Sequence, residues 1–360
     1  MISSFKIKGF KQFQEIEISN LSRITLLGGK NSSGKTSILE GLFLFYHRGD
    51  ARVLFQQLEF RGITAVGLSK DSIWLPIFNK FNLKQNIEVE ISDGKSQEKM
   101  VIKHNKNYVH KAIISSIPIT DLQNQTKNVQ QTHTSNSLDF KYFVGDNKIG
   151  ETHLILDRGN ISMEMDSLIP SAFSQQKVTI IPSSGNKNIN DIAVKFGEID
   201  IRGETNLIVD IIKIIEPRLK SLSTIAQGNQ SNIYGDIGLG KKIPVQYMGE
   251  GAAKLLSIIV LIAANKDGVI LIDEIENGFH HSVLNKILKA IYKTACTFNC
   301  QIIATTHSYE LLENLASIIN NKNKNDFCYV RLDWKKDKSI PKTYTGDMLK
   351  TAIAKDWEVR

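Results

Sequence analysis

The sequence predicts an α/β protein in which a mainly parallel sheet is flanked by helices. Three stretches carry this prediction, because in each a short apolar run of strand length precedes a polar turn and a segment of helical periodicity. The apolar runs are residues 24–27, 269–273 and 302–305. Strands that alternate with helices join a parallel sheet through right-handed crossovers. With 41% hydrophobic residues among 360, the chain can bury a large core in one big domain or two moderate ones.

The N-terminal half also predicts antiparallel strands. Residues 4–19 alternate apolar and polar side chains on both sides of a turn at 9–12. Further strands are expected at 87–91, 100–102, 140–143 and 153–156, with a polar loop at 121–137. A helix is expected over residues 53–60, but the position of Gln56 and Gln57 does not settle whether either contacts a ligand.

Residues 29–36 satisfy the pattern G-x-x-x-x-G-K-[ST] between a predicted strand and a predicted helix. Gly29 and Gly34 allow the backbone to curl so that successive N–H groups point inward, beside the positive end of the helix. Lys35 can reach the β- and γ-phosphates of a nucleotide, and the Thr36 hydroxyl can ligate Mg²⁺. A glycine-rich turn that binds nothing is the alternative, and the flanking strand and helix argue against it. The predicted nucleotide-binding residues are Gly29, Lys30, Asn31, Ser32, Ser33, Gly34, Lys35, Thr36 and Ser37.

The C-terminal half is expected to complete the parallel sheet. A buried strand at 178–181 is followed by two helical segments, of which the stronger ends at Pro217. No heptad persists, which excludes a long coiled-coil arm. The remaining elements are helices to residue 264 and at 283–295, 309–319 and 347–355, and a strand at 327–332.

Asp273 and Glu274 stand at the carboxyl end of their apolar strand, where parallel sheets bind ligands. A phosphate-bound Mg²⁺ needs a second protein anchor at a neighbouring strand end, so Asp273 is the predicted metal ligand beside Thr36. A water that attacks the γ-phosphate needs an orienting base, and Glu274 fits that role. The alternative is a solvated Asp-Glu pair without a role. Because the same chain also contains the glycine loop, we favour a role for the pair in binding and hydrolysing the nucleotide.

His307 follows the next predicted strand and can hydrogen-bond the γ-phosphate, although a lone histidine is often incidental. Gly249 and Gly251 open the helix before the Asp273 strand and offer a second anion site at a helix N-terminus. One subunit needs only one such loop for its own triphosphate. The second loop therefore predicts a homodimer around two ATP molecules, and a tight turn at a helix start is the alternative.

Composition limits the compartment and the partners. No apolar run approaches the roughly 20 residues of a membrane span, and the N-terminus lacks the apolar region of a signal peptide. Three cysteines without metal-ligand spacing suggest free thiols in a reducing cytoplasm. The excess of 45 Lys+Arg over 37 Asp+Glu permits a polyanion such as DNA, and a merely soluble basic surface explains it equally well.

Four elements carry a resemblance to a known family: the phosphate loop at 29–36, the glycine turn at 248–252, the strand end with Asp273 and Glu274, and His307. In this order they resemble the ABC-class ATPases of the RecF-like and OLD-like branch of AAA family ATPases. The resemblance rests on residues 5–13, on the phosphate loop at 29–36 with its Asn31, and on the stretch Asp-Glu-Ile-Glu-Asn-Gly-Phe-His at 273–280. The signature at 248–252 departs from Leu-Ser-Gly-Gly-Gln, with Gly249 in place of serine and Glu250 in place of glycine. The match covers roughly residues 1–60 and 240–320.

The resemblance implies a P-loop NTPase of ABC-ATPase type, with an antiparallel β subdomain and a short helical insertion. The expected parts of this single domain, residues 1–360, are a phosphate-loop half (1–60), a β-rich subdomain with a variable insert (61–180), a helical insertion (181–240) and a half with the signature, the Asp273 strand and His307 (241–360).

The resemblance also implies a function. The layout is similar to the stand-alone ATPase subunits of anti-phage systems such as PARIS, including the final residues 357–360. We therefore expect slow hydrolysis of Mg·ATP, a switch that senses phage or altered DNA, and a separate effector, such as a TOPRIM-like nuclease. A RecF-like DNA-repair or chromosome-maintenance ATPase is the alternative, and a scaffold that binds ATP without turnover is a third.

Overall fold

The computed structural model describes most of the chain. The described residues are 1–47, 50, 53–54, 73–109, 134–157, 160–165, 177–183, 189–228, 230–335 and 338–359. Most of the helix expected at 53–60, including Gln56 and Gln57, lies outside them, as do residues 121–133 of the expected loop. Within the described part, no helix combines the length and the apolar character needed to cross a membrane.

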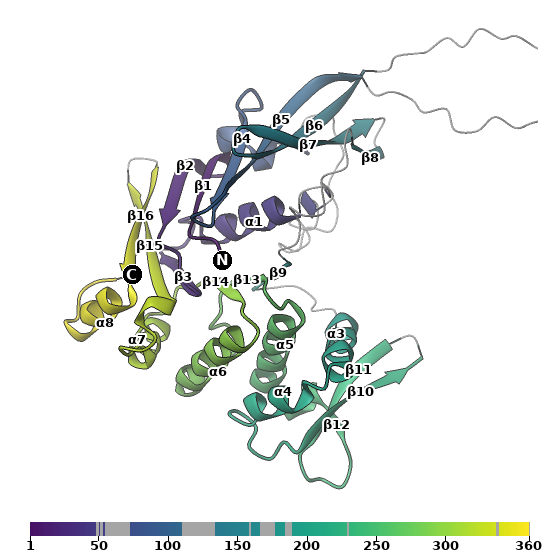
Figure 1. Ribbon diagram of the computed structural model, residues 1–360, viewed down its shortest axis with the longest axis vertical. Coiled ribbons are helices and arrows are strands. Elements are labelled where there is room, and N and C mark those ends of the chain that lie inside the picture. The colour runs from purple at the N-terminus through teal and green to yellow at the C-terminus, as the bar shows by residue number, and fades with distance from the viewer. Residues whose placement is uncertain are drawn as a thin grey trace, which may run out of the picture.

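A six-stranded sheet forms the centre of the molecule, in the order β16-β15-β3-β14-β13-β9 (Figure 1). Five strands are parallel, and β16 joins the edge antiparallel to β15. The bounds are β3 Ile24–Gly29, β9 Val178–Ile181, β13 Val269–Ile272, β14 Gln301–Thr305, β15 Phe327–Lys335 and β16 Lys338–Thr345. The predicted fold class, a mainly parallel sheet flanked by helices, is confirmed.

Alternate residues of the parallel strands face two separate cores. In β13, Ile270 and Ile272 pack into the core of the helical side, whereas Val269 and Leu271 pack into the core that contains α1 (Lys35–Tyr46). All four side chains are fully buried. Burial on both faces explains why these strands read as continuous apolar runs instead of alternating ones.

A seven-stranded antiparallel sheet covers α1 on the side away from the central sheet (Figure 1). Its order is β2-β1-β4-β5-β6-β7-β8. The bounds are β1 Ser4–Phe10, β2 Phe13–Ser19, β4 Ile87–Ser92, β5 Gln97–Val109, β6 Thr134–Val144, β7 Asn147–Asp157 and β8 Asn160–Met165. In β4, buried and partly exposed residues alternate, as expected for a sheet with one face on the core.

Helices α5, α6 and α7 cover the opposite face of the central sheet, and a lobe of α3, α4 and β10–β12 projects beside α5 (Figure 1). The bounds are α3 Ile189–Ile201, α4 Thr205–Ile212, α5 Glu250–Ala264, α6 Leu284–Thr297, α7 Tyr309–Ile318, α8 Gly346–Ala354, β10 Ser221–Gln227, β11 Gln230–Asp236 and β12 Ile243–Pro244. Short 3₁₀ turns are η1 Leu75–Ile77, η2 Asn79–Phe81, η4 Val245–Met248, η5 His281–Val283 and η6 Lys324–Asp326.

Some sequence expectations were incomplete or wrong. Residues 134–137 were expected in a loop but begin β6, because Ser137 donates to Asp139 and is buried between β5 and β7. β9 was expected to be buried but is mostly half-buried, since it is the edge strand of the central sheet. The insertion at 181–240 is not only helical, because β10 and β11 pair there.

Candidate functional site

The loop between β3 and α1 has a backbone that depends on glycine. Gly29 has φ 132° and Gly34 has φ 102°, both in the region that other residues rarely adopt. A Cβ on Gly34 would lie 2.2 Å from Phe13 Cζ, and one on Gly29 would lie 2.6 Å from the Leu332 carbonyl oxygen. The antiparallel sheet and β15 therefore pack closely against the loop and leave no room for a side chain at either glycine.

Lys35 lies over its own loop. Its Nζ donates to the carbonyl oxygens of Gly29 at 2.9 Å and Lys30 at 3.1 Å. Burial lowers the pKa of Lys35, and the negative charges of Asp273, Glu274 and Glu276 oppose that effect. The ammonium group is thus held at the α1 N-terminus, where the helix and the loop amides favour anions.

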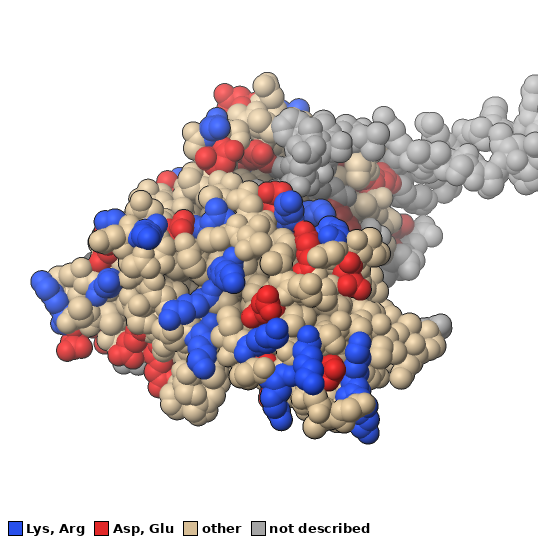
Figure 2. All heavy atoms as spheres, turned by 60° about the horizontal axis from the view of Figure 1, so that its bottom comes forward, with Lys and Arg blue, Asp and Glu red and all other residues tan. Residues whose placement is uncertain are grey.

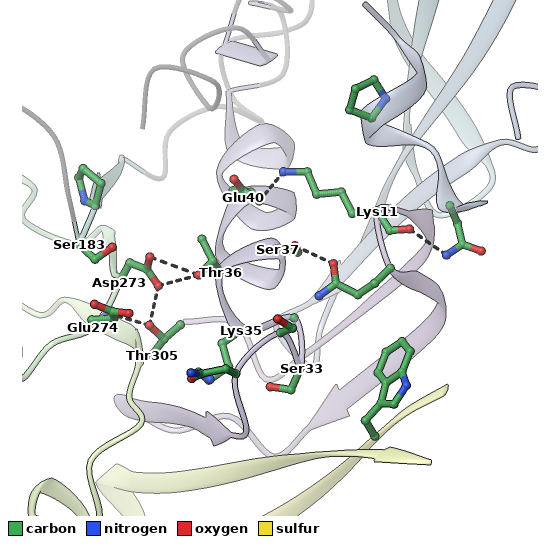
Figure 3. A pocket seen from close by; sticks show the side chains of 18 of the residues that line it. Lys11, Ser33, Lys35, Thr36, Ser37, Glu40, Ser183, Asp273, Glu274 and Thr305 are labelled. Carbon is green, nitrogen blue, oxygen red and sulfur yellow. Dashed lines mark hydrogen bonds and ion pairs between the residues drawn. The ribbon is translucent and has the colours of Figure 1, made fainter. Parts of the chain in front are cut away.

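Thr36, Asp273 and Thr305 form one hydrogen-bonded group at the strand ends (Figure 3). Thr36 Oγ1 donates to the Asp273 carboxylate at 3.0 and 3.2 Å, and Thr305 Oγ1 donates to Asp273 Oδ1 at 2.6 Å. A carboxylate and a hydroxyl in contact are hard oxygen ligands of the kind that Mg²⁺ prefers. The residues present therefore fit the expected metal.

Glu274 is held by the same threonine. Its backbone N–H donates to Thr305 Oγ1 at 2.7 Å, and its φ of 49° turns the chain sharply at the end of β13. The side chain lines the cleft beside Asp273 (Figure 3). A single hydroxyl thus positions both adjacent carboxylates.

His307 lies beside Glu274 but does not line the cleft. Its Nδ1 is 3.3 Å from Glu276 Oε1 and 4.0 Å from Glu274 Oε1, and its backbone N–H donates to Glu276 Oε1 at 2.9 Å. Just over half of the side chain, 53%, is exposed. The histidine is therefore fixed at its backbone by Glu276 and accessible at its ring.

The cleft has a volume of about 1120 Å³ and opens between the phosphate loop, the antiparallel sheet and the end of β9. Of the predicted residues, Asp273, Glu274 and residues 31–37 line it. Gly29 and Lys30 contribute carbonyl oxygens behind Lys35 instead. His307, Gly249 and Gly251 do not line it.

Several lining residues were not predicted from the sequence: Lys11, Gln12, Ser183 and Thr305. Ser37 Oγ donates to Gln12 Oε1 at 3.0 Å, and Lys11 pairs with Glu40. Their positions in the sequence could have indicated three of them. Lys11 and Gln12 lie in the predicted turn at 9–12, and Ser183 follows a predicted strand.

Gly249 and Gly251 lie at the N-terminus of α5, away from this cleft. Gly249 is exposed with φ 112°, and a Cβ there would meet nothing within 4 Å. Gly251 is near Phe279, in the turn that follows Glu276. The two glycines therefore make no contribution to the cleft of their own chain.

Two family models match parts of the chain. Residues 132–313, just over half of the chain, match a family described as an AAA domain, with the AbiEii toxin and type IV TA systems named in the description. Residues 1–156 match a family described as an AAA ATPase domain.

Matches over almost the whole chain include a curated relative and a solved structure. A Helicobacter pylori protein named ATP/GTP phosphatase is 23% identical over 385 residues, covering 97% of each chain. A crystal structure of an Smc head bound to the C-winged helix domain of ScpA is 14% identical, covers 98% of this chain and 99% of that chain, and has a TM-score of 0.51. By its family matches and its fold, the chain belongs to the AAA-domain ATPases and is built as an ABC-type P-loop ATPase head.

Proposed function

We propose that this ATPase is a Mg²⁺-dependent nucleotide switch that acts in prokaryotic anti-phage defence and controls a separate effector, a nuclease. The observation that carries the nucleotide part is the contact between Thr36 and Asp273, which meet in the cleft although they are 237 residues apart in the chain. The fold thereby joins the phosphate loop to the acidic strand end.

The residues of the cleft have separable roles in this proposal. Lys35 and the loop amides bind the phosphates, and Thr36 and Asp273 would hold Mg²⁺. When bound, the ion neutralises charge on the β- and γ-phosphates. Glu274 orients the attacking water and accepts its proton. His307 does not line the cleft itself, but its exposed ring lies beside Glu274, from where it would reach the γ-phosphate and distinguish ATP from ADP.

The exposed N-terminus of α5 supports an ATP-dependent homodimer. The helix has 15 residues, and its first turn presents Gly249 and Gly251 outside the cleft of its own subunit. Its positive end can serve the triphosphate of a second copy. Closing two subunits over two nucleotides would give the ATP state and the ADP state different surfaces, as a switch requires.

The role in defence rests on the family matches and on the resemblance in sequence. The matched family names a toxin and a type IV TA system, which supports control of a harmful effector. The relative named ATP/GTP phosphatase supports hydrolysis of purine triphosphates by this chain as well.

Glu274→Gln tests the switch. We expect the variant to bind ATP, to lose turnover and to accumulate as a dimer in light-scattering measurements with Mg·ATP, whereas Lys35→Ala should remain a monomer. A variant that hydrolyses ATP at the wild-type rate, or that stays monomeric with ATP bound, would contradict the proposal.

Expression with the neighbouring genes tests the effector. We expect a nuclease to co-purify with the wild-type protein, and the amount of co-purified nuclease to change in Lys35→Ala. Phage challenge should make that nuclease toxic only when both proteins are present. Identical survival without the ATPase gene would remove the defence role and leave the ATPase chemistry intact.

A DNA-maintenance ATPase is the second candidate, and one surface favours it. Figure 2 shows Lys and Arg side chains gathered on the face formed by the bottom of Figure 1. Helix α6 contributes to the basic character with Lys286, Lys289 and Lys293, all exposed at helical spacing, and has no acidic residue. Such a stripe can contact a phosphate backbone.

Charge reversal of this stripe distinguishes the two candidates. If DNA is the partner, DNA should stimulate hydrolysis, and changing the three α6 lysines to Glu should abolish the stimulation and flatten the salt dependence of binding. The matched control changes three other exposed lysines to Glu: Lys84 in the turn before β4, Lys95 in the turn between β4 and β5, and Lys103 on β5. Equal effects of the two triple variants would indicate only a nonspecific loss of positive charge.

A further inference from the structure

The cleft has a second arm that the phosphate chemistry does not use. Figure 3 shows Asp273, Glu274 and Ser183 on one side of α1 and Lys11 on the other, and Asn79 donates to the Lys11 carbonyl oxygen. Gln12, Lys80, Phe81 and Trp334 also line the cleft. Its volume of about 1120 Å³ lies just above the roughly 300–1,000 Å³ typical of small-molecule sites. The terminal phosphate belongs at the acidic side, so the nucleoside must extend into the other arm.

Two exposed aromatic side chains line the cleft. Among the described residues, Phe81 and Trp334 are the large hydrophobic side chains that both line it and remain exposed, at 68% and 46%. Lys80 and Phe81 also have φ values of 51° and 55°, which bulky residues adopt only when surrounding structure imposes them. The backbone therefore holds Phe81 in place at a site where it gains little from burial.

The register of β15 carries Trp334 to the phosphate loop. Leu332 pairs with Gly29 at the end of β3, and Trp334 lies two residues beyond it on the same face of the strand. On β16, Ser339 pairs with Trp334, and Ser339 Oγ is 3.5 Å from the Ser33 carbonyl oxygen. The β15–β16 hairpin thus places the indole beside the loop.

We propose that Trp334 and Phe81 hold the base of the bound nucleoside triphosphate by stacking. This inference rests on the proposed nucleotide site. One polar atom of each nearby amide is already engaged, since Asn79 Nδ2 donates to the Lys11 carbonyl oxygen at 2.8 Å and Gln12 Oε1 accepts from Ser37. Recognition through the faces of the base discriminates weakly between adenine and guanine, so both ATP and GTP bind.

Binding measurements with ATP, GTP and inorganic tripolyphosphate test the stacking. Loss of one base-stacking contact weakens binding by roughly 5- to 140-fold. We expect Trp334→Ala to weaken ATP and GTP binding by such a factor, and tripolyphosphate binding by less than about twofold. Phe81→Ala should act in the same direction, and Trp334→Phe should retain the affinity for ATP.

Indole fluorescence gives a second readout. Trp74 is fully buried and Trp357 is 56% exposed away from the cleft, so ATP should quench chiefly Trp334. The quenching should vanish in Trp334→Phe, which still binds ATP, and persist in the matched control Trp357→Phe.

Two outcomes would overturn the stacking. Equal weakening of tripolyphosphate and ATP in Trp334→Ala would mean that the indole only supports the loop, and unchanged affinity for ATP would mean that it contacts no base. Lys35→Ala distinguishes failure of the stacking proposal from failure of the proposed nucleotide site. If Lys35→Ala loses ATP while Trp334→Ala does not, only the stacking fails, whereas wild-type ATP binding by Lys35→Ala would refute the nucleotide site.

Discussion

Replacing Thr305 with Val tests how the two carboxylates are positioned. The Thr305 hydroxyl donates to Asp273 Oδ1 at 2.6 Å and accepts the Glu274 N–H at 2.7 Å. Valine has a similar shape but makes neither bond. A hydrogen bond to a charged group contributes about 1.5–3 kcal/mol, and about 1.4 kcal/mol changes a rate tenfold. We therefore expect Thr305→Val to lower kcat for ATP hydrolysis by about 10- to 100-fold.

The assay is phosphate release at saturating Mg·ATP, with ATP affinity measured in parallel. ATP affinity in EDTA should change by less than about threefold, because Lys35 and the loop amides are untouched. Thr305→Ser is the matched control, since it keeps the hydroxyl and should retain most of the activity. The reasoning is refuted if Thr305→Val turns over at the wild-type rate, or if the serine variant is equally slow.

Two further predictions concern the loop and the antiparallel sheet. Gly34→Ala should abolish nucleotide binding, because its Cβ would lie 2.2 Å from Phe13 Cζ. The control Gly145→Ala, also at positive φ but with open space around it, should bind ATP normally. Isothermal titration compares the two variants, and equal ATP binding would show that the loop tolerates the clash. Burial raises the pKa of Asp139, but hydrogen bonds, first that from His153, outweigh it and leave the pKa below its usual value. Asp139→Asn should therefore lose about 2 kcal/mol of stability at neutral pH, and urea unfolding should show the difference shrinking as the pH falls below the usual pKa of 3.8. A difference independent of pH would contradict the assigned charge.

The sheet that carries the site was predictable because its strands are buried on both faces. Residues 269–272 read as an unbroken apolar run, and the adjacent carboxylates mark the strand end. By contrast, β16 was missed, because it is an edge strand that contains Pro341, buries the polar Ser339 and exposes the apolar Ile340. β10 was missed for the same kind of reason, since its sequence is polar and mostly half-exposed.

The details of the site depend on tertiary register, which local sequence does not encode. Thr305 reaches Asp273 only because Ile272 pairs with Ala304, which places the next residues of β13 and β14 side by side. Trp334 reaches the phosphate loop only because Leu332 pairs with Gly29. The residues of each motif could be named in advance, whereas the partners that position them could not.

The Mg²⁺ dependence of ATP binding tests most directly whether the two ends of the chain share one metal-bound nucleotide. ATP affinity is measured by titration with Mg²⁺ and with EDTA, for the wild type and for Asp273→Asn. The wild type should bind ATP more tightly with Mg²⁺, and Asp273→Asn should lose that gain while keeping the affinity seen in EDTA. An undiminished Mg²⁺ effect in Asp273→Asn would contradict the shared site.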